Sequence, residues 1–177
     1  MAFADDRCIR PLPRLKAAKS VRPDPLDTFQ RIAIAEAYPF ERIGDRELRI
    51  GLVGLWCDHD LSIGWDGEAE RLSLVILFDG RVPGGRSDSI CRLLTLLNER
   101  LDAGHFGFLQ SEAALVYRHA LTLKGGAKLS TDQALDVMSQ ALDAVERGYP
   151  AAQYVIWAGK SPEDALAEAL VDIASHG

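Results

Sequence analysis

Four adjacent residues have side chains that could bind a metal: Cys57, Asp58, His59 and Asp60. A thiolate, an imidazole and carboxylates are all zinc ligands, so with His105 they would suggest a metal-dependent enzyme. Successive side chains of a strand point to opposite faces, so Cys57 can converge only with His59, and Asp58 only with Asp60. Polar residues that join two strands are also typical of a hairpin connection, which is the favoured interpretation. We therefore predict no metal and no cofactor.

Other residues that could do chemistry have simpler explanations. The glycine-rich stretch 80–85 lacks the lysine and the strand-to-helix turn of a phosphate-binding loop. Ser87 and Ser89 lie at the start of a predicted helix, where capping explains a serine better than nucleophilic attack. His119 falls on the core-facing register of a strand, where a hydrogen-bonded structural role is favoured over a general base. The sequence therefore predicts that the protein is not an enzyme.

Three tryptophans and one arginine are the candidates for binding a partner. Trp56 and Trp65 lie at the ends of predicted strands, and Trp157 follows an apolar run near the C-terminus. Aromatic side chains anchor interfaces and ligand grooves, but they also fill cores, which is the favoured explanation here. Arg118 points to the opposite face of its strand from His119. The candidate interface or partner-binding residues are therefore Trp56, Trp65, Arg118 and Trp157.

Hydrophobic spacing predicts the elements that position these residues. Apolar residues three and four apart indicate helices at 26–37, 87–101 and 130–145, and Ser161 with Pro162 opens a last helix. Alternating or continuous apolar residues indicate strands at 48–57, 61–66, 72–78, 105–109 and 115–123. Pro150 ends or kinks the third helix, and 151–157 continues as a short helical segment, with a strand at 153–157 as the alternative.

The order of these elements predicts the fold class. It is helix, three strands, helix, two strands and two helices (α-β-β-β-α-β-β-α-α), with short turns between consecutive strands. Such an order indicates an α+β fold, with an antiparallel sheet of about five strands and helices packed on one side.

Composition and charge limit the class of protein. The chain has 177 residues, of which 47% are apolar and 26% charged, as expected for one soluble domain. The apolar runs are too short for a membrane span, and no signal peptide is visible, so we expect a cytoplasmic protein. Cys8, Cys57 and Cys91 are an odd set without C-x-x-C spacing, which indicates reduced thiols. A net charge of −6 argues against nucleic-acid binding.

The first 25 residues differ in composition from the rest. They hold four of the eight prolines and six cations against three acids. Such a segment buries little apolar surface, so we predict a flexible basic arm at 1–25 and a single domain at 26–177. An unstructured leader is favoured over a tether to an acidic partner or a membrane surface.

Four segments resemble the YbjN-domain family as it occurs in proteobacteria. They are 78–83, 96–101 with 104–106, 117–121 and 149–163, and the last, YPAAQYVIWAGKSPE, is the most specific. The resemblance covers roughly residues 26–174. It implies a fold like that of the type III secretion chaperones, often paired into a homodimer. It also implies a binding protein described as a regulator of sensory transduction, with no attached set of catalytic residues and no named partner.

These observations leave two main hypotheses for function. The leading one is a cytoplasmic homodimer, chaperone-like or regulatory, that binds another, unidentified protein through an apolar surface. Its support from the residues is a second apolar face of the predicted sheet, formed by Val53, Leu55, Val75 and Leu77. The alternative is a small-molecule sensor with a pocket between sheet and helices, near Trp56, Trp65, His119 or Arg118.

Overall fold

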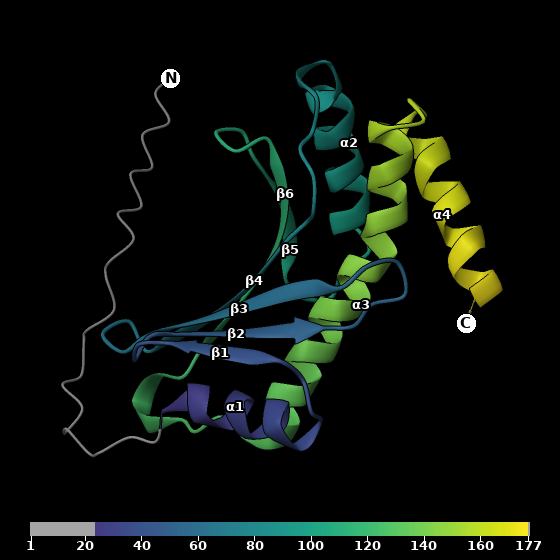
Figure 1. Ribbon diagram of the computed structural model, residues 1–177. Helices are drawn as coiled ribbons and strands as arrows, with labels where there is room; N and C mark the ends of the chain where they lie inside the picture. Colours follow the sequence, from purple (N-terminus) through teal and green to yellow (C-terminus); the bar gives the residue numbers. More distant parts are fainter. Residues whose placement is uncertain (1–23, 177) are drawn as a thin grey trace, which may run out of the picture.

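The computed structural model describes residues 24–176. The predicted arm lies outside the described residues, except for Asp24 and Pro25. The elements are α1 (Pro25–Ala35), β1 (Phe40–Ile43), β2 (Glu47–Leu52), β3 (His59–Asp66), β4 (Arg71–Leu77), α2 (Ser87–Asn98), β5 (His105–Leu109), β6 (Ala114–Thr122), α3 (Thr131–Ile156) and α4 (Pro162–His176). Figure 1 shows their arrangement. No helix in this part of the chain is both long and apolar enough to cross a bilayer.

The strands form one antiparallel sheet in the order β1-β2-β3-β4-β6-β5. The predicted α+β class is confirmed, with one strand more than expected. Sequence analysis missed β1, which has only four residues, three of them exposed. The predicted strand at 48–57 is wrong in its second half, because β2 ends at Leu52 and residues 53–58 form a loop.

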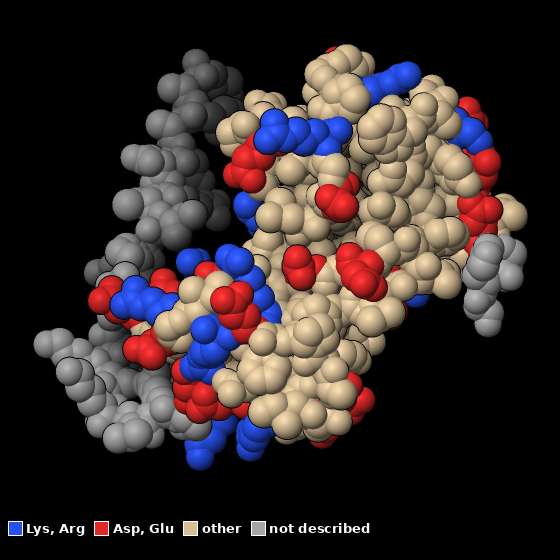
Figure 2. Space-filling model, viewed as in Figure 1, with Lys and Arg blue, Asp and Glu red and all other residues tan. Residues whose placement is uncertain are grey.

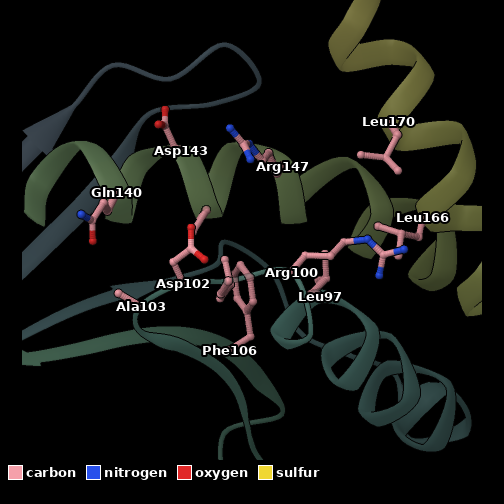
Figure 3. Close-up of a pocket in the computed structure, with 12 residues that line it drawn as sticks. Leu97, Arg100, Asp102, Ala103, Phe106, Gln140, Asp143, Arg147, Leu166 and Leu170 are labelled. Atoms are coloured by element: carbon pink, nitrogen blue, oxygen red, sulfur yellow. The ribbon is translucent and has the colours of Figure 1, made fainter. Parts of the chain in front are cut away.

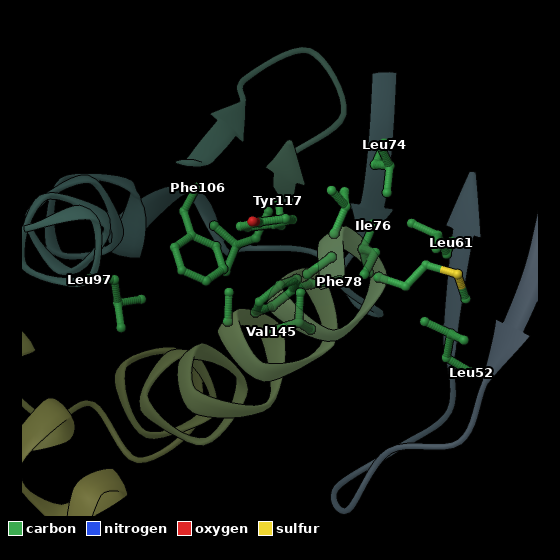
Figure 4. Close-up of a cluster of buried hydrophobic side chains, with 14 of the residues drawn as sticks. Leu52, Leu61, Leu74, Ile76, Phe78, Leu97, Phe106, Tyr117 and Val145 are labelled. Atoms are coloured by element: carbon green, nitrogen blue, oxygen red, sulfur yellow. The ribbon is translucent and has the colours of Figure 1, made fainter. Parts of the chain in front are cut away.

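The sheet has an inner face, which the helices cover, and an outer face. On β2, β3 and β4 the inner face carries fully buried leucines and isoleucines: Leu48, Ile50, Leu61, Ile63, Leu72, Leu74 and Ile76. Helix α1 packs against β2 and β3, and α3 packs against β4 and β6. Figure 4 shows part of this core, with Phe78, Phe106 and Tyr117 close to Val145 of α3. Outer-facing residues of these three strands are exposed or half-buried, so no described helix covers the outer face there.

Helix α3 is the longest element and connects the two ends of the molecule. It begins with the predicted capping box, in which Ser130 Oγ accepts from Gln133 N and Gln133 Oε1 accepts from Ser130 N. It then continues through Pro150 to Ile156, so the alternative of a strand at 153–157 is wrong. Its first half lies under the sheet, and its second half lies beside α2 and α4 (Figure 1).

Candidate protein-binding surface

Three large apolar side chains are exposed on the outer face of the sheet and on the adjoining loop. Val53 is 73% exposed and Leu55 is 59% exposed in the loop 53–58, and Leu77 at the end of β4 is 49% exposed. Val75, also on the outer face, is half-buried. Three of the four residues that the sequence assigned to a second apolar face are therefore exposed. We refer to the loop 53–58 with Val75 and Leu77 as the candidate surface.

Charged residues are unevenly distributed over the molecule. Figure 2 shows lysine, arginine, aspartate and glutamate crowded around α1 and the neighbouring strands, at the lower left of the view. A broad area above and to the right of them carries few charges. Single exposed apolar residues are normal, whereas a group with few charges around it is typical of interaction sites.

A half-buried carboxylate holds the loop 53–58 in place. Glu146 reaches the loop from α3: its Oε2 accepts from Leu55 N at 2.7 Å, and its Oε1 lies 2.6 Å from His59 Nε2. The His59 side chain is only 2% exposed and that of Glu146 is 18% exposed. Gly54 makes this approach possible, because a Cβ there would collide with the Glu146 carboxylate and the Cys57 carbonyl. The exposed Val53 and Leu55 therefore sit on a fixed loop.

The neighbouring thiol is not arranged for nucleophilic catalysis. Cys57 Sγ lies 3.8 Å from Nδ1 and 3.9 Å from Nε2 of His59, at the long end of the range for a weak sulfur hydrogen bond. Burial raises the pKa of Cys57, the carboxylates around it raise it further, and only a hydrogen bond with Tyr149 lowers it. The residue is therefore a thiol at neutral pH, whereas the thiolate is the nucleophile. His59 is already bound to Glu146, which leaves the cluster with a structural role.

The candidate metal ligands do not form one site, because Cys57 and His59 lie together but His105 does not join them. His59 faces α3 on the inner side of the sheet, whereas His105 pairs with Arg118 and shares its outer-facing register. Among the described residues, no group of three or more histidine, cysteine, aspartate or glutamate side chains is placed to hold a metal ion.

The four candidate interface residues lie in different parts of the molecule. Trp56 is half-buried in the loop 53–58, and Arg118 is exposed on the outer face, opposite Val75 on β4. Trp65 is half-buried at the end of β3, beside the turns that join the strands. Trp157 is 73% exposed just after α3. Only Trp56 and Arg118 therefore belong to the loop and the face that carry the candidate surface.

His119 faces the core as predicted, but its hydrogen bonding differs from the prediction. Its Nδ1 is buried and has no hydrogen-bond partner among the described residues. Burial lowers the pKa of His119, and the charge of Asp136 partly opposes this effect. The ring is therefore neutral at pH 7, and its role is packing between β6 and α3.

Sequence reasoning missed Glu146, the residue that organises the loop. A signal was present, because Glu146 follows the core residue Val145 and precedes Tyr149 by three positions on an amphipathic helix. A charged residue at the margin of a buried helix face needs a partner. Its partners are 87 and 91 positions away in the sequence, so spacing alone could not identify them.

Comparison with known proteins places the chain in a family. The sequence profile described as "YbjN: Putative bacterial sensory transduction regulator" matches residues 25–153. The crystal structure of YbjN from E. coli, titled a putative transcription regulator, is similar with a TM-score of 0.51 and 12% identity, over 70% of this chain and 87% of that one. A chain of the ExsC–ExsE complex has a TM-score of 0.49 and 19% identity, over 68% and 90%. No curated protein matches the sequence. The family profile covers well over half of the residues of this chain, so the chain belongs to the YbjN family.

Proposed function

We propose that this protein is a non-enzymatic, chaperone-like or regulatory factor that binds other proteins through the candidate surface. The observation that carries the proposal is the pair of exposed side chains Val53 and Leu55 on a loop that Glu146 fixes from inside. The family description, a regulator of sensory transduction, agrees with a binding role. We place this activity in the cytoplasm.

The fixed loop favours binding for a thermodynamic reason. Ordering a flexible interface loop costs about 0.5–1.5 kcal/mol for each immobilised side chain, and this cost is subtracted from the affinity. Here folding has already restricted the loop, because Leu55 N and His59 both bind the Glu146 carboxylate. A partner therefore gains the burial of Val53 and Leu55, about 25 cal/mol per Å² of apolar area, with little ordering cost.

We further propose that the first partner is a second copy of the chain. Residues 24–177 carry a formal charge of −10, because residues 1–23 hold six cations and two acids of a total of −6. Two such acidic domains repel each other, so a dimer needs a contact surface with few charges. Asp58 is the one charged residue of the candidate surface, and Arg118 lies opposite Val75, so symmetric use of this surface by both copies would bring few charges together and give a closed dimer.

Light scattering on the purified full chain tests the proposal. We expect a dimer for the wild type and a monomer for the double variant Val53→Glu/Leu55→Glu. Val171→Glu is the matched control, because Val171 is 67% exposed on α4, outside the candidate surface. It should remain a dimer. A monomeric wild type would refute the dimer, and equal masses for both variants would show that the contact lies elsewhere.

Affinity capture from host lysate then tests for another protein partner. A protein retained by the wild type and by Val171→Glu, and lost with Val53→Glu/Leu55→Glu, would support a docking role for the loop. A partner that all three proteins retain equally would mean that the docking surface is elsewhere.

A further inference from the structure

A pocket of about 270 Å³ lies between α2, α3 and α4, away from the candidate surface. Its lining is apolar where Leu97, Phe106 and Leu166 meet, and the chain after α2 closes one side (Figure 3). Neither Trp56, Trp65, Arg118 nor His119 lines it, so it is not the pocket that the sequence suggested.

The last helix, which lies beyond the residues that the family profile matches, forms part of this pocket. The family profile ends at residue 153, whereas α4 spans Pro162–His176. Leu166 and Leu170 of α4 form one wall. The helix is firmly attached, because Ala165 and Ala169 are fully buried and Tyr154 Oη donates to Asp172 Oδ2 at 2.5 Å.

Charged side chains of both signs surround the apolar lining. Asp102 and Asp143 lie toward one end of the pocket, and Arg100 lies toward the other, next to Leu166, with Arg147 between them on α3 (Figure 3). In the described part of the chain, none of these four side chains forms an ion pair within 4.0 Å. Arg100 Nη1 donates to the backbone oxygen of Leu96, and its remaining donors are available.

The separation of the charges suggests the size of a ligand. Asp143 and Arg147 are four residues apart on one helix, which places their Cβ atoms about 5–6 Å apart. An extended dipeptide separates its two charged ends by about 7 Å, whereas the charges of a single amino acid are only about 2.5 Å apart. The volume lies just below the range of about 300–1,000 Å³ for drug-sized ligands, so the occupant is small.

We propose that this pocket binds a dipeptide with apolar side chains and two free ends. Its ammonium group faces Asp143 and Asp102, its carboxylate faces Arg147 and Arg100, and its side chains pack on Leu97, Phe106 and Leu166. The proposal does not depend on the candidate surface, because the two sites share no residue.

Isothermal titration calorimetry of the full chain with leucyl-leucine tests this assignment. N-acetyl-leucyl-leucine lacks the ammonium charge, leucyl-leucinamide lacks the carboxylate, and leucine carries both charges too close together. We expect leucyl-leucine to bind at least about tenfold more tightly than each of these three. No binding of leucyl-leucine at millimolar concentration, or equal binding of leucine, would overturn the proposal.

Two conservative variants assign the ends of the ligand. Asp143→Asn should weaken leucyl-leucine binding and leave the affinity for the N-acetyl compound unchanged. Arg147→Gln should weaken leucyl-leucine binding and leave the affinity for the amide unchanged. Asp132→Asn, an exposed change on the same helix outside the pocket, is the control and should bind like the wild type. If the two pocket variants also bind like the wild type, the charges do not hold the ligand and the proposal fails.

Discussion

Replacing Glu146 with alanine should destabilise the protein more than any ordinary change on the exposed side of α3. The variant loses the 2.6 Å contact with His59 Nε2 and the 2.7 Å hydrogen bond from Leu55 N. The His59 side chain is only 2% exposed, so the cost of leaving its nitrogen without a partner is about 1–3 kcal/mol. Water can replace the acceptor of the Leu55 amide, so this second loss adds about 1 kcal/mol. We expect a total of about 2–4 kcal/mol.

Urea unfolding measures the total, and amide hydrogen exchange measures the loop itself. Leu55 N–H should exchange slowly in the wild type, although the Leu55 side chain is 59% exposed, and rapidly in Glu146→Ala. Glu146→Gln keeps one acceptor oxygen and should cost about half as much. Asp143→Ala is the matched control, an exposed carboxylate one turn earlier on α3, and should cost less than about 0.5 kcal/mol. Equal losses for Glu146→Ala and Asp143→Ala, or fast exchange of Leu55 N–H in the wild type, would refute the reasoning.

Three further predictions concern the fold. Gly104→Ala should lower the stability by at least about 2 kcal/mol more than Gly125→Ala, as measured by thermal unfolding. Both glycines have φ +73°, so the backbone strain is the same, but only at Gly104 would the new Cβ collide with Tyr117 Oη. Burial raises the pKa of Tyr117 in the folded state, so the free energy of unfolding falls as the pH rises above about 10, where Tyr117 ionises in the unfolded chain. Tyr117→Phe removes this effect. Its loss of stability relative to the wild type should therefore be smaller at pH 11 than at pH 7, as measured by urea unfolding. Ser130→Ala should cost about 1 kcal/mol by removing the capping box, whereas Ser139→Ala, an exposed change in the same helix, should be close to neutral.

Most of the fold could be predicted from local patterns. Strand β4 and helix α2 were predicted to within a few residues, because regular apolar spacing coincides with burial in both. Strand β5 was also predicted, although Phe106 is its one buried residue. Strand β1 gave no such pattern, since its side chains are largely exposed. The error at 48–57 has the opposite cause: Val53 and Leu55 continue the apolar pattern of β2, although the chain has already left the sheet.

The candidate site was less predictable because its contacts are distant in the sequence. The turn containing Cys57 and His59 could be recognised, but its partner Glu146 comes from a helix almost ninety positions later. The exposure of Trp157 was also predicted wrongly. A core position was favoured for this residue, but it is 73% exposed. The α2–α3–α4 pocket was not predicted, because its lining residues come from three helices whose packing against one another is not visible in local sequence patterns.

Pro150 has a consequence for how the two proposed sites influence each other. Proline cannot donate a hydrogen bond to the carbonyl four residues earlier, and in α3 that carbonyl belongs to Glu146. The helix therefore lacks one backbone hydrogen bond at the turn whose side chains Glu146 and Arg147 reach the loop 53–58 and the α2–α3–α4 pocket. We expect a ligand that shifts this turn to change the affinity at the other site, and thermodynamic reciprocity would require the same coupling free energy in both directions.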